Sequence, residues 1–151
     1  MKSKTVATWL AFLGGPLGLH RFYLHGFGDP VGWLLPLPTL VGAYGVLRMA
    51  SLGQDDGLSW VLTPILGFTV AACCLTAIVY GLRKPHEWNA RFNPGADAEA
   101  PAGQTRWATV WAIVLSLMVG AGVLMTSIAI SFQGYFERQV EEGRRISGPS
   151  S

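Results

Sequence analysis

The sequence predicts an all-helical (all-α), polytopic integral membrane protein with about four transmembrane helices. Half of its 151 residues are hydrophobic and 13% are charged, whereas a soluble domain usually has about 25% charged residues. Two runs, Leu58–Leu82 and Trp107–Phe132, contain no Asp, Glu, Lys or Arg over 25 and 26 residues. A helix needs about 20 apolar residues to cross the hydrocarbon core of a bilayer. A soluble protein of this size has too little interior to bury two such helices.

The first segment predicts a short transmembrane helix that begins after a basic tail. Val6–Leu19 is apolar over 14 residues, or about 21 Å of helix against the ~30 Å of a hydrocarbon core. A helix from Lys2 to Leu24 would be about 33 Å long and would span if its charged ends reached the headgroups. A half-spanning segment is the alternative. A secretory signal is disfavoured, because bulky aromatic residues follow where a cleavage site needs small ones.

The second helix completes a helix pair over residues 1–53. Gly, Asp and Pro residues predict a short turn at 25–30, and Val31–Leu52 follows as an apolar helix. Its Leu-Pro-Leu-Pro stretch at residues 35–38 should kink it, because proline lacks the amide hydrogen of the helical ladder. Residues 54–82 then form a loop and the third helix, with Pro64 in its first turns.

The second half of the chain predicts a polar loop, a fourth helix and a polar tail. Residues 83–106 are polar, and the Ala-, Gly- and Pro-rich stretch 93–104 predicts a flexible linker. Within this loop, Trp88 and Phe92 beside basic residues suggest a stretch that lies on the membrane. Residues 107–132 form the fourth helix, and the tail 133–151 carries a weak apolar face typical of an interfacial helix.

Charge counting leaves the orientation open. With four spans, six basic residues lie on the side of the N-terminus and five on the other side, which is too even for the positive-inside rule. If the first segment does not span, residues 83–106 move to the N-terminal side. The count then favours that side as the cytoplasmic one.

Small residues recur at the spacing that lets membrane helices pack closely. Gly14 and Gly18 form one such pair, and Ser116 and Gly120 form another. Contact within one chain and formation of a homo-oligomer are both compatible with these ridges.

The basic-aromatic run at the end of the first segment is the main candidate site. His20, Arg21, Phe22 and Tyr23 follow a Gly-rich apolar stretch, where cations complement the end of a helix dipole. Arg21 is expected to anchor at headgroups or to pair with Asp29, and alternatively to bind an anionic lipid headgroup or the carboxylate of a partner.

Other kinds of site find little support in the residues. The spacing of His20, His25 and Asp29 matches no firm pattern of metal ligands, so we predict no metal and no cofactor. Adjacent Cys73 and Cys74 are expected to be packing or lipid-facing thiols rather than a disulfide. A net charge of +2 without a basic patch argues against binding of nucleic acid. We find no catalytic triad, phosphate loop or carboxylate pair, so we expect no enzyme.

The N-terminal third resembles a known family. Lys2–Thr5 (Lys-Ser-Lys-Thr), Leu10–Gly15 (Leu-Ala-Phe-Leu-Gly-Gly) and Gly18–Leu24 (Gly-Leu-His-Arg-Phe-Tyr-Leu) are similar to the TM-two domain, a pair of transmembrane helices joined by a short turn. The resemblance covers roughly residues 2–52 and implies His20, Arg21 and Phe22 as the family signature. It implies no catalytic residue and no assigned biochemical activity. Many members carry an Asp late in the second helix, where this chain has Arg48.

These observations together predict a non-enzymatic interaction or scaffold module, with the run around His20–Phe22 as its contact surface. Its expected partners are the lipid bilayer, and beyond it anionic headgroups, another membrane protein or a second copy. A small transporter or channel subunit is the alternative, with a polar path at the Pro-broken second helix. The resemblance implies a bacterial protein of the cytoplasmic membrane.

Overall fold

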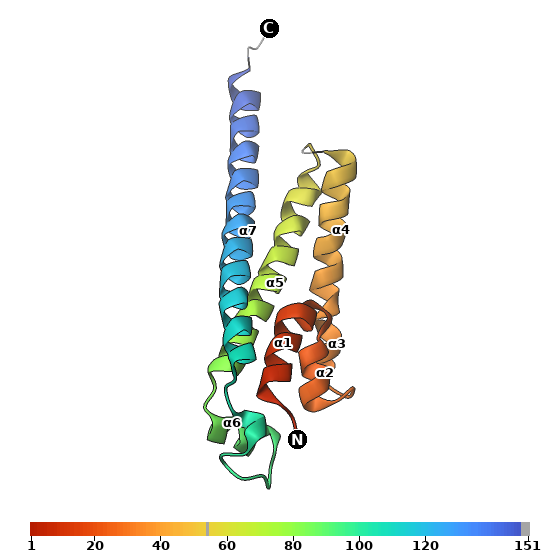
Figure 1. Cartoon of the computed structure of the whole chain (residues 1–151). Coiled ribbons are helices and arrows are strands. Elements are labelled where there is room, and N and C mark those ends of the chain that lie inside the picture. The colour runs from red at the N-terminus through yellow and green to blue at the C-terminus, as the bar shows by residue number, and fades with distance from the viewer. Residues whose placement is uncertain (54, 149–151) are drawn as a thin grey trace.

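The structure, a computed structural model that describes residues 1–53 and 55–148, confirms the all-helical class (Figure 1). Three stretches are long and apolar enough to cross a membrane, namely Pro30–Leu52, Gly57–Leu82 and Pro101–Ser147. The count of about four spans is therefore not confirmed. In order, the elements are α1 (Lys4–Gly14), η1 (Gly15–Leu17), α2 (Leu19–His25), α3 (Pro30–Leu34), α4 (Pro36–Leu52), α5 (Gly57–Leu82), α6 (Pro85–Phe92), η2 (Pro101–Gly103) and α7 (Trp107–Ser147).

The first segment is not one helix, and the prediction of a continuous helix over residues 2–24 is wrong. α1 ends at Gly14, a single 3-10 turn follows, and Gly18 adopts a left-handed conformation with φ +76°. An α-helix cannot continue through a left-handed residue, so the chain reverses direction and α2 runs back toward the N-terminus (Figure 1).

The second span agrees with its prediction. α3 and α4 together cover Pro30–Leu52 and are separated at Leu35. The expected break is confirmed, because Pro36 and Pro38 supply no amide hydrogens to the helical ladder. At its far end, Arg48 pairs with Asp56 through a 2.6 Å bond from Nε to Oδ2, which ties α4 to the first turn of α5.

α5 is the centre of the bundle and packs against α1, α4 and α7. Glycines at the contact points have no side chain, and this allows the helices to approach closely. A Cβ on Gly42 of α4 would lie 2.3 Å from the backbone nitrogen of Leu66, and one on Gly120 of α7 would lie 2.7 Å from Cβ of Cys74. In lipid no hydrophobic force drives helices together, so close packing of this kind is what holds them in contact. Cys73 and Cys74 are buried packing thiols.

Residues 83–106 form an ordered cap on one end of the bundle rather than a flexible linker. Trp88 of α6 is fully buried, and the Asn89 side-chain amide donates to the carbonyls of Asp97, Ala98 and Ala100. The apolar face of α6 therefore packs on the protein, which corrects the expectation of a stretch lying on the membrane. The composition of residues 93–104 suggested a linker. The hydrogen bonds that order this segment leave no periodic pattern in its sequence, so they could not be predicted from it.

α7 begins at Trp107 as predicted and continues far past the expected end at residue 132. Its 41 residues correspond to about 62 Å of helix, roughly twice the hydrocarbon thickness. The C-terminal part of α7 extends beyond the other helices (Figure 1), although Gly134 still lies against Trp60 of α5. The charged residues after position 132 end the apolar run, but the helix continues, because charged side chains are compatible with a helix exposed to water. Positions 149–151 of the expected tail lie outside the described residues.

Candidate functional site

Three segments that are distant in the sequence meet at one end of the bundle, and we call this junction the collar (residues 2–5, 23–24 and 83–105). The backbone amide of Lys2 donates to Oδ1 of Asn93 at 2.6 Å, and Trp88 donates from Nε1 to the Lys2 carbonyl at 2.9 Å. The Lys2 ammonium donates to the carbonyl of Leu24, and the amide of Ser3 donates to the Tyr23 hydroxyl at 2.8 Å. The start of α1 and the end of α2 are therefore at the same level.

Lys4 is the most deeply placed charge of the collar. Its side chain is fully buried, and Nζ donates to the carbonyl of Arg83 at 2.9 Å and to Oγ1 of Thr105 at 2.7 Å. Burial lowers the pKa of this ammonium. Two neutral oxygen acceptors thus hold the lysine of the N-terminal Lys-Ser-Lys-Thr motif and connect it to the loop that precedes α7.

Arg21 forms a two-pronged ion pair with Asp29 across the short turn. Nε donates to Oδ2 at 2.6 Å and an Nη nitrogen donates to Oδ1 at 3.2 Å. The Asp29 side chain is only 8% exposed, and its hydrogen bonds from Arg21 lower the pKa of this carboxyl. This pairing was one of the expected alternatives.

His20 lies inside the protein rather than on a contact surface. Its side chain is 3% exposed, its ring packs edge-on against Tyr80 at 5.9 Å between centroids, and Nδ1 has no hydrogen-bond partner. Burial, with the positive charge of Arg21 beside it, lowers the pKa of His20 to about 4. The ring is therefore neutral near neutral pH. Among the described residues, no group of three His, Cys, Asp or Glu side chains is placed to hold a metal ion.

Phe22 belongs to an exposed aromatic cluster, which we call the turn cluster (Phe22, Phe27 and Trp33). The Phe22 ring stacks on Phe27 at 5.5 Å and meets Trp33 edge-on at 5.2 Å between centroids. Trp33 donates from Nε1 to the carbonyl of Phe27 at 2.9 Å, although 63% of Trp33 and 78% of Phe27 are exposed. Sequence reasoning missed Phe27 and Trp33, because the turn that joins them to Phe22 leaves no periodic signal.

The glycines of the first predicted ridge have separate roles. Gly14 faces the side chain of Leu19 within the same hairpin, and Gly18 forms the left-handed turn, where a Cβ would lie 2.3 Å from the Gly32 carbonyl oxygen. They do not form a packing face of one helix.

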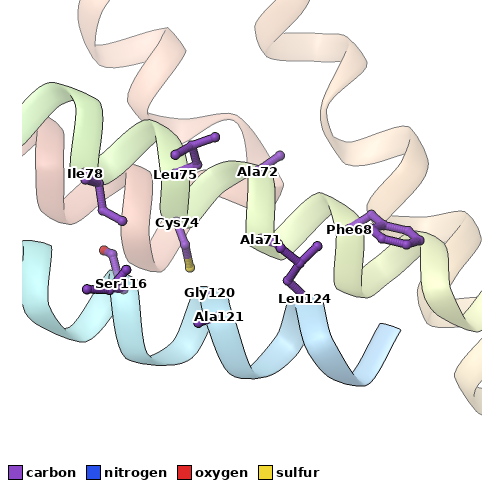
Figure 2. Close-up of a pocket in the computed structure, with 11 residues that line it drawn as sticks. Phe68, Ala71, Ala72, Cys74, Leu75, Ile78, Ser116, Gly120, Ala121 and Leu124 are labelled. Carbon is purple, nitrogen blue, oxygen red and sulfur yellow. The ribbon is translucent and has the colours of Figure 1, made fainter. Parts of the chain in front are cut away.

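The second predicted ridge faces α5. Ser116 and Gly120 lie beside Cys74 at a groove of about 410 Å³ between α5 and α7 (Figure 2). Alanine and larger apolar side chains line the rest of this groove.

Because His20 is buried, we predict that the stability of the fold decreases at acidic pH. Because its pKa falls from about 6.5 in an unfolded chain to about 4 in the folded protein, the unfolded state binds the extra proton first as the pH drops. The stability that His20 contributes is present above pH 6.5 and is lost as the pH falls toward 4. A His20→Gln variant should lack this loss, as measured by denaturation in detergent across that range.

His86→Gln serves as the control for this measurement. The His86 side chain is 55% exposed, so the variant removes a surface histidine and leaves the buried ring of His20 in place. The variant should keep the wild-type slope between pH 6.5 and 4. An unchanged slope in His20→Gln would contradict the assignment to His20.

The three apolar helices and their polar collar define an integral membrane protein. Comparison with protein families then identifies its N-terminal part, because residues 1–48 match the TM2 domain. The match confirms the resemblance seen in the sequence and extends from α1 into α4. No curated protein and no solved structure matches the chain.

Proposed function

We propose that this TM2 domain protein is a non-enzymatic interaction module of the membrane that contacts another membrane protein through the turn cluster. One observation carries the proposal. The polar side chains of the signature are used inside the protein, since His20 is buried and Arg21 is paired with Asp29. What the turn presents to its surroundings is aromatic.

The turn cluster has the properties of a protein contact. Aromatic side chains bury a large area at little cost in conformational entropy, and they dominate the energy of many interfaces. The Arg21–Asp29 pair and the hydrogen bond from Trp33 to the Phe27 carbonyl hold the cluster in place. Aromatic rings also sit at the headgroup level of membranes as simple anchors, and the experiment has to separate these two roles.

The test compares partners that co-purify in a mild detergent with the wild type and with a Phe27→Ala/Trp33→Ala double variant. We expect at least one specific membrane-protein partner to be reduced tenfold or more, with insertion and melting temperature preserved. Phe136→Ala, which removes an exposed aromatic ring from the C-terminal part of α7, is the matched control. An unchanged set of partners would reject the proposal, and a variant that inserts poorly would identify an anchor instead.

A further inference from the structure

We propose that α1, η1 and α2 form a re-entrant hairpin, which enters the bilayer from the cytoplasmic side and leaves on the same side. The chain then crosses the membrane three times. The N-terminus, the turn cluster and residues 83–106 share the cytoplasmic side, and the end of α7 lies on the other side. This inference does not depend on the proposed function, but it places the contact surface of that proposal at the cytoplasmic face.

The depth of the hairpin follows from its contacts with the helices beside it. A Cβ on Gly15 would lie 2.5 Å from Cβ of Cys73, so the tip of the hairpin is level with Cys73. Cys73 is ten residues from Arg83, where α5 ends and the collar begins, which corresponds to about 15 Å of helix. The tip therefore reaches about half of a ~30 Å hydrocarbon core.

Both ends of the hairpin return to the collar. Lys2 bonds to the Leu24 carbonyl, Ser3 bonds to Tyr23, and Lys4 bonds to Arg83. A helix that crossed the bilayer would instead separate the residues at its two ends by the full membrane thickness. Figure 1 shows the N-terminus and α6 at one end of the bundle, and the last turns of α4 and of α7 at the other.

The tip satisfies the condition that a membrane interior imposes on irregular backbone. Such backbone is tolerated only where protein covers it or its polar groups are bonded. The amide of Gly18 donates to the Gly15 carbonyl at 2.8 Å, and the Thr39 hydroxyl donates to the Pro16 carbonyl at 2.8 Å. Pro16 itself has no amide hydrogen to satisfy. Gly15 and Gly18 are buried against α5 and α3.

Charge then orients the protein. Seven basic residues lie at the collar end, namely Lys2, Lys4, Arg21, Arg83, Lys84, Arg91 and Arg106, and four lie at the other end, namely Arg48, Arg138, Arg144 and Arg145. The even count of a four-span arrangement thus becomes a clear asymmetry. By the positive-inside rule, the collar end is cytoplasmic.

Labelling with a membrane-impermeant maleimide tests this arrangement in intact and permeabilised cells. The background is Cys73→Ala/Cys74→Ala, and single cysteines are placed in a short tag ahead of Met1 and at Gly28, Asp55, Glu99 and Ser147. These four residues are exposed. We expect the tag, Gly28→Cys and Glu99→Cys to react only after permeabilisation, and Asp55→Cys and Ser147→Cys to react in intact cells. The background protein without added cysteine is the control.

The tag and Gly28→Cys decide between the two arrangements. If they report opposite sides, the first segment spans the bilayer and the hairpin is rejected. If they report the same side but that side is exterior, the orientation is rejected. Neither result depends on whether a partner binds the turn cluster, so failure here and failure of the proposed function are distinguishable.

Discussion

Trp88→Ala is expected to lower the free energy of unfolding by about 3–5 kcal/mol, the usual cost of removing a large aromatic side chain from a core. The indole is fully buried, its ring packs on Tyr80 at 5.8 Å and on Phe92 at 4.5 Å between centroids, and its Nε1 holds the Lys2 carbonyl. The variant therefore creates a cavity and leaves that carbonyl without its indole donor. The N-terminal segment should also separate from the cap.

The measurement is unfolding by a denaturing detergent, followed by far-UV circular dichroism. Trp107→Ala is the matched control, because Trp107 is 80% exposed and the same side chain is lost without a cavity. Equal effects of the two variants would contradict the role of Trp88 in joining the cap to the bundle. Protease sensitivity of residues 93–104 should rise in Trp88→Ala alone.

Gly18→Val is the second substitution with a large expected effect, and it acts on the reversal of the hairpin. A left-handed conformation costs a residue with a Cβ about 1–2 kcal/mol. In addition, a Cβ at Gly18 would lie 2.3 Å from the carbonyl oxygen of Gly32, a backbone atom that has little room to move. Overpacking of this kind typically costs about 1–3 kcal/mol. We expect the variant to lose the docking of α2 on α3.

Two neighbouring glycines serve as comparisons. Gly26 has φ +83° and ψ 175°, a backbone region that essentially only glycine adopts, and no atom lies within 4 Å of an added Cβ. Gly26→Ala therefore measures a backbone cost without a steric contact. Gly28 is equally open and has no positive φ, so Gly28→Ala should be neutral. Gly18→Val and Gly26→Ala should both destabilise the protein more than Gly28→Ala. A Gly18→Val variant as stable as Gly28→Ala would show that the turn is not built as described.

The candidate site was predicted only in part from its residue pattern. The run His20–Tyr23 marked the family and the place in the chain, and the pairing of Arg21 with Asp29 was among its expected roles. The pattern did not separate the members of the run, although the fold gives them different environments. His20 is buried and Phe22 supports two exposed aromatic rings, because the turn that follows returns the chain alongside α2.

The sequence by itself determined the membrane class, the helices that cover Pro30–Leu52 and Gly57–Leu82, the start of α7 and the TM2 signature. These features follow from the length and polarity of continuous segments, because those two properties decide whether a segment partitions into the bilayer. Only the tertiary structure decided that the first segment turns back and that residues 83–106 form a cap. Both depend on hydrogen bonds and close contacts between residues far apart in the chain, such as Thr39 with Pro16 and Trp88 with Lys2. Hydropathy measures how strongly a segment prefers lipid. It does not show which backbone groups will be hydrogen-bonded by residues far away in the sequence.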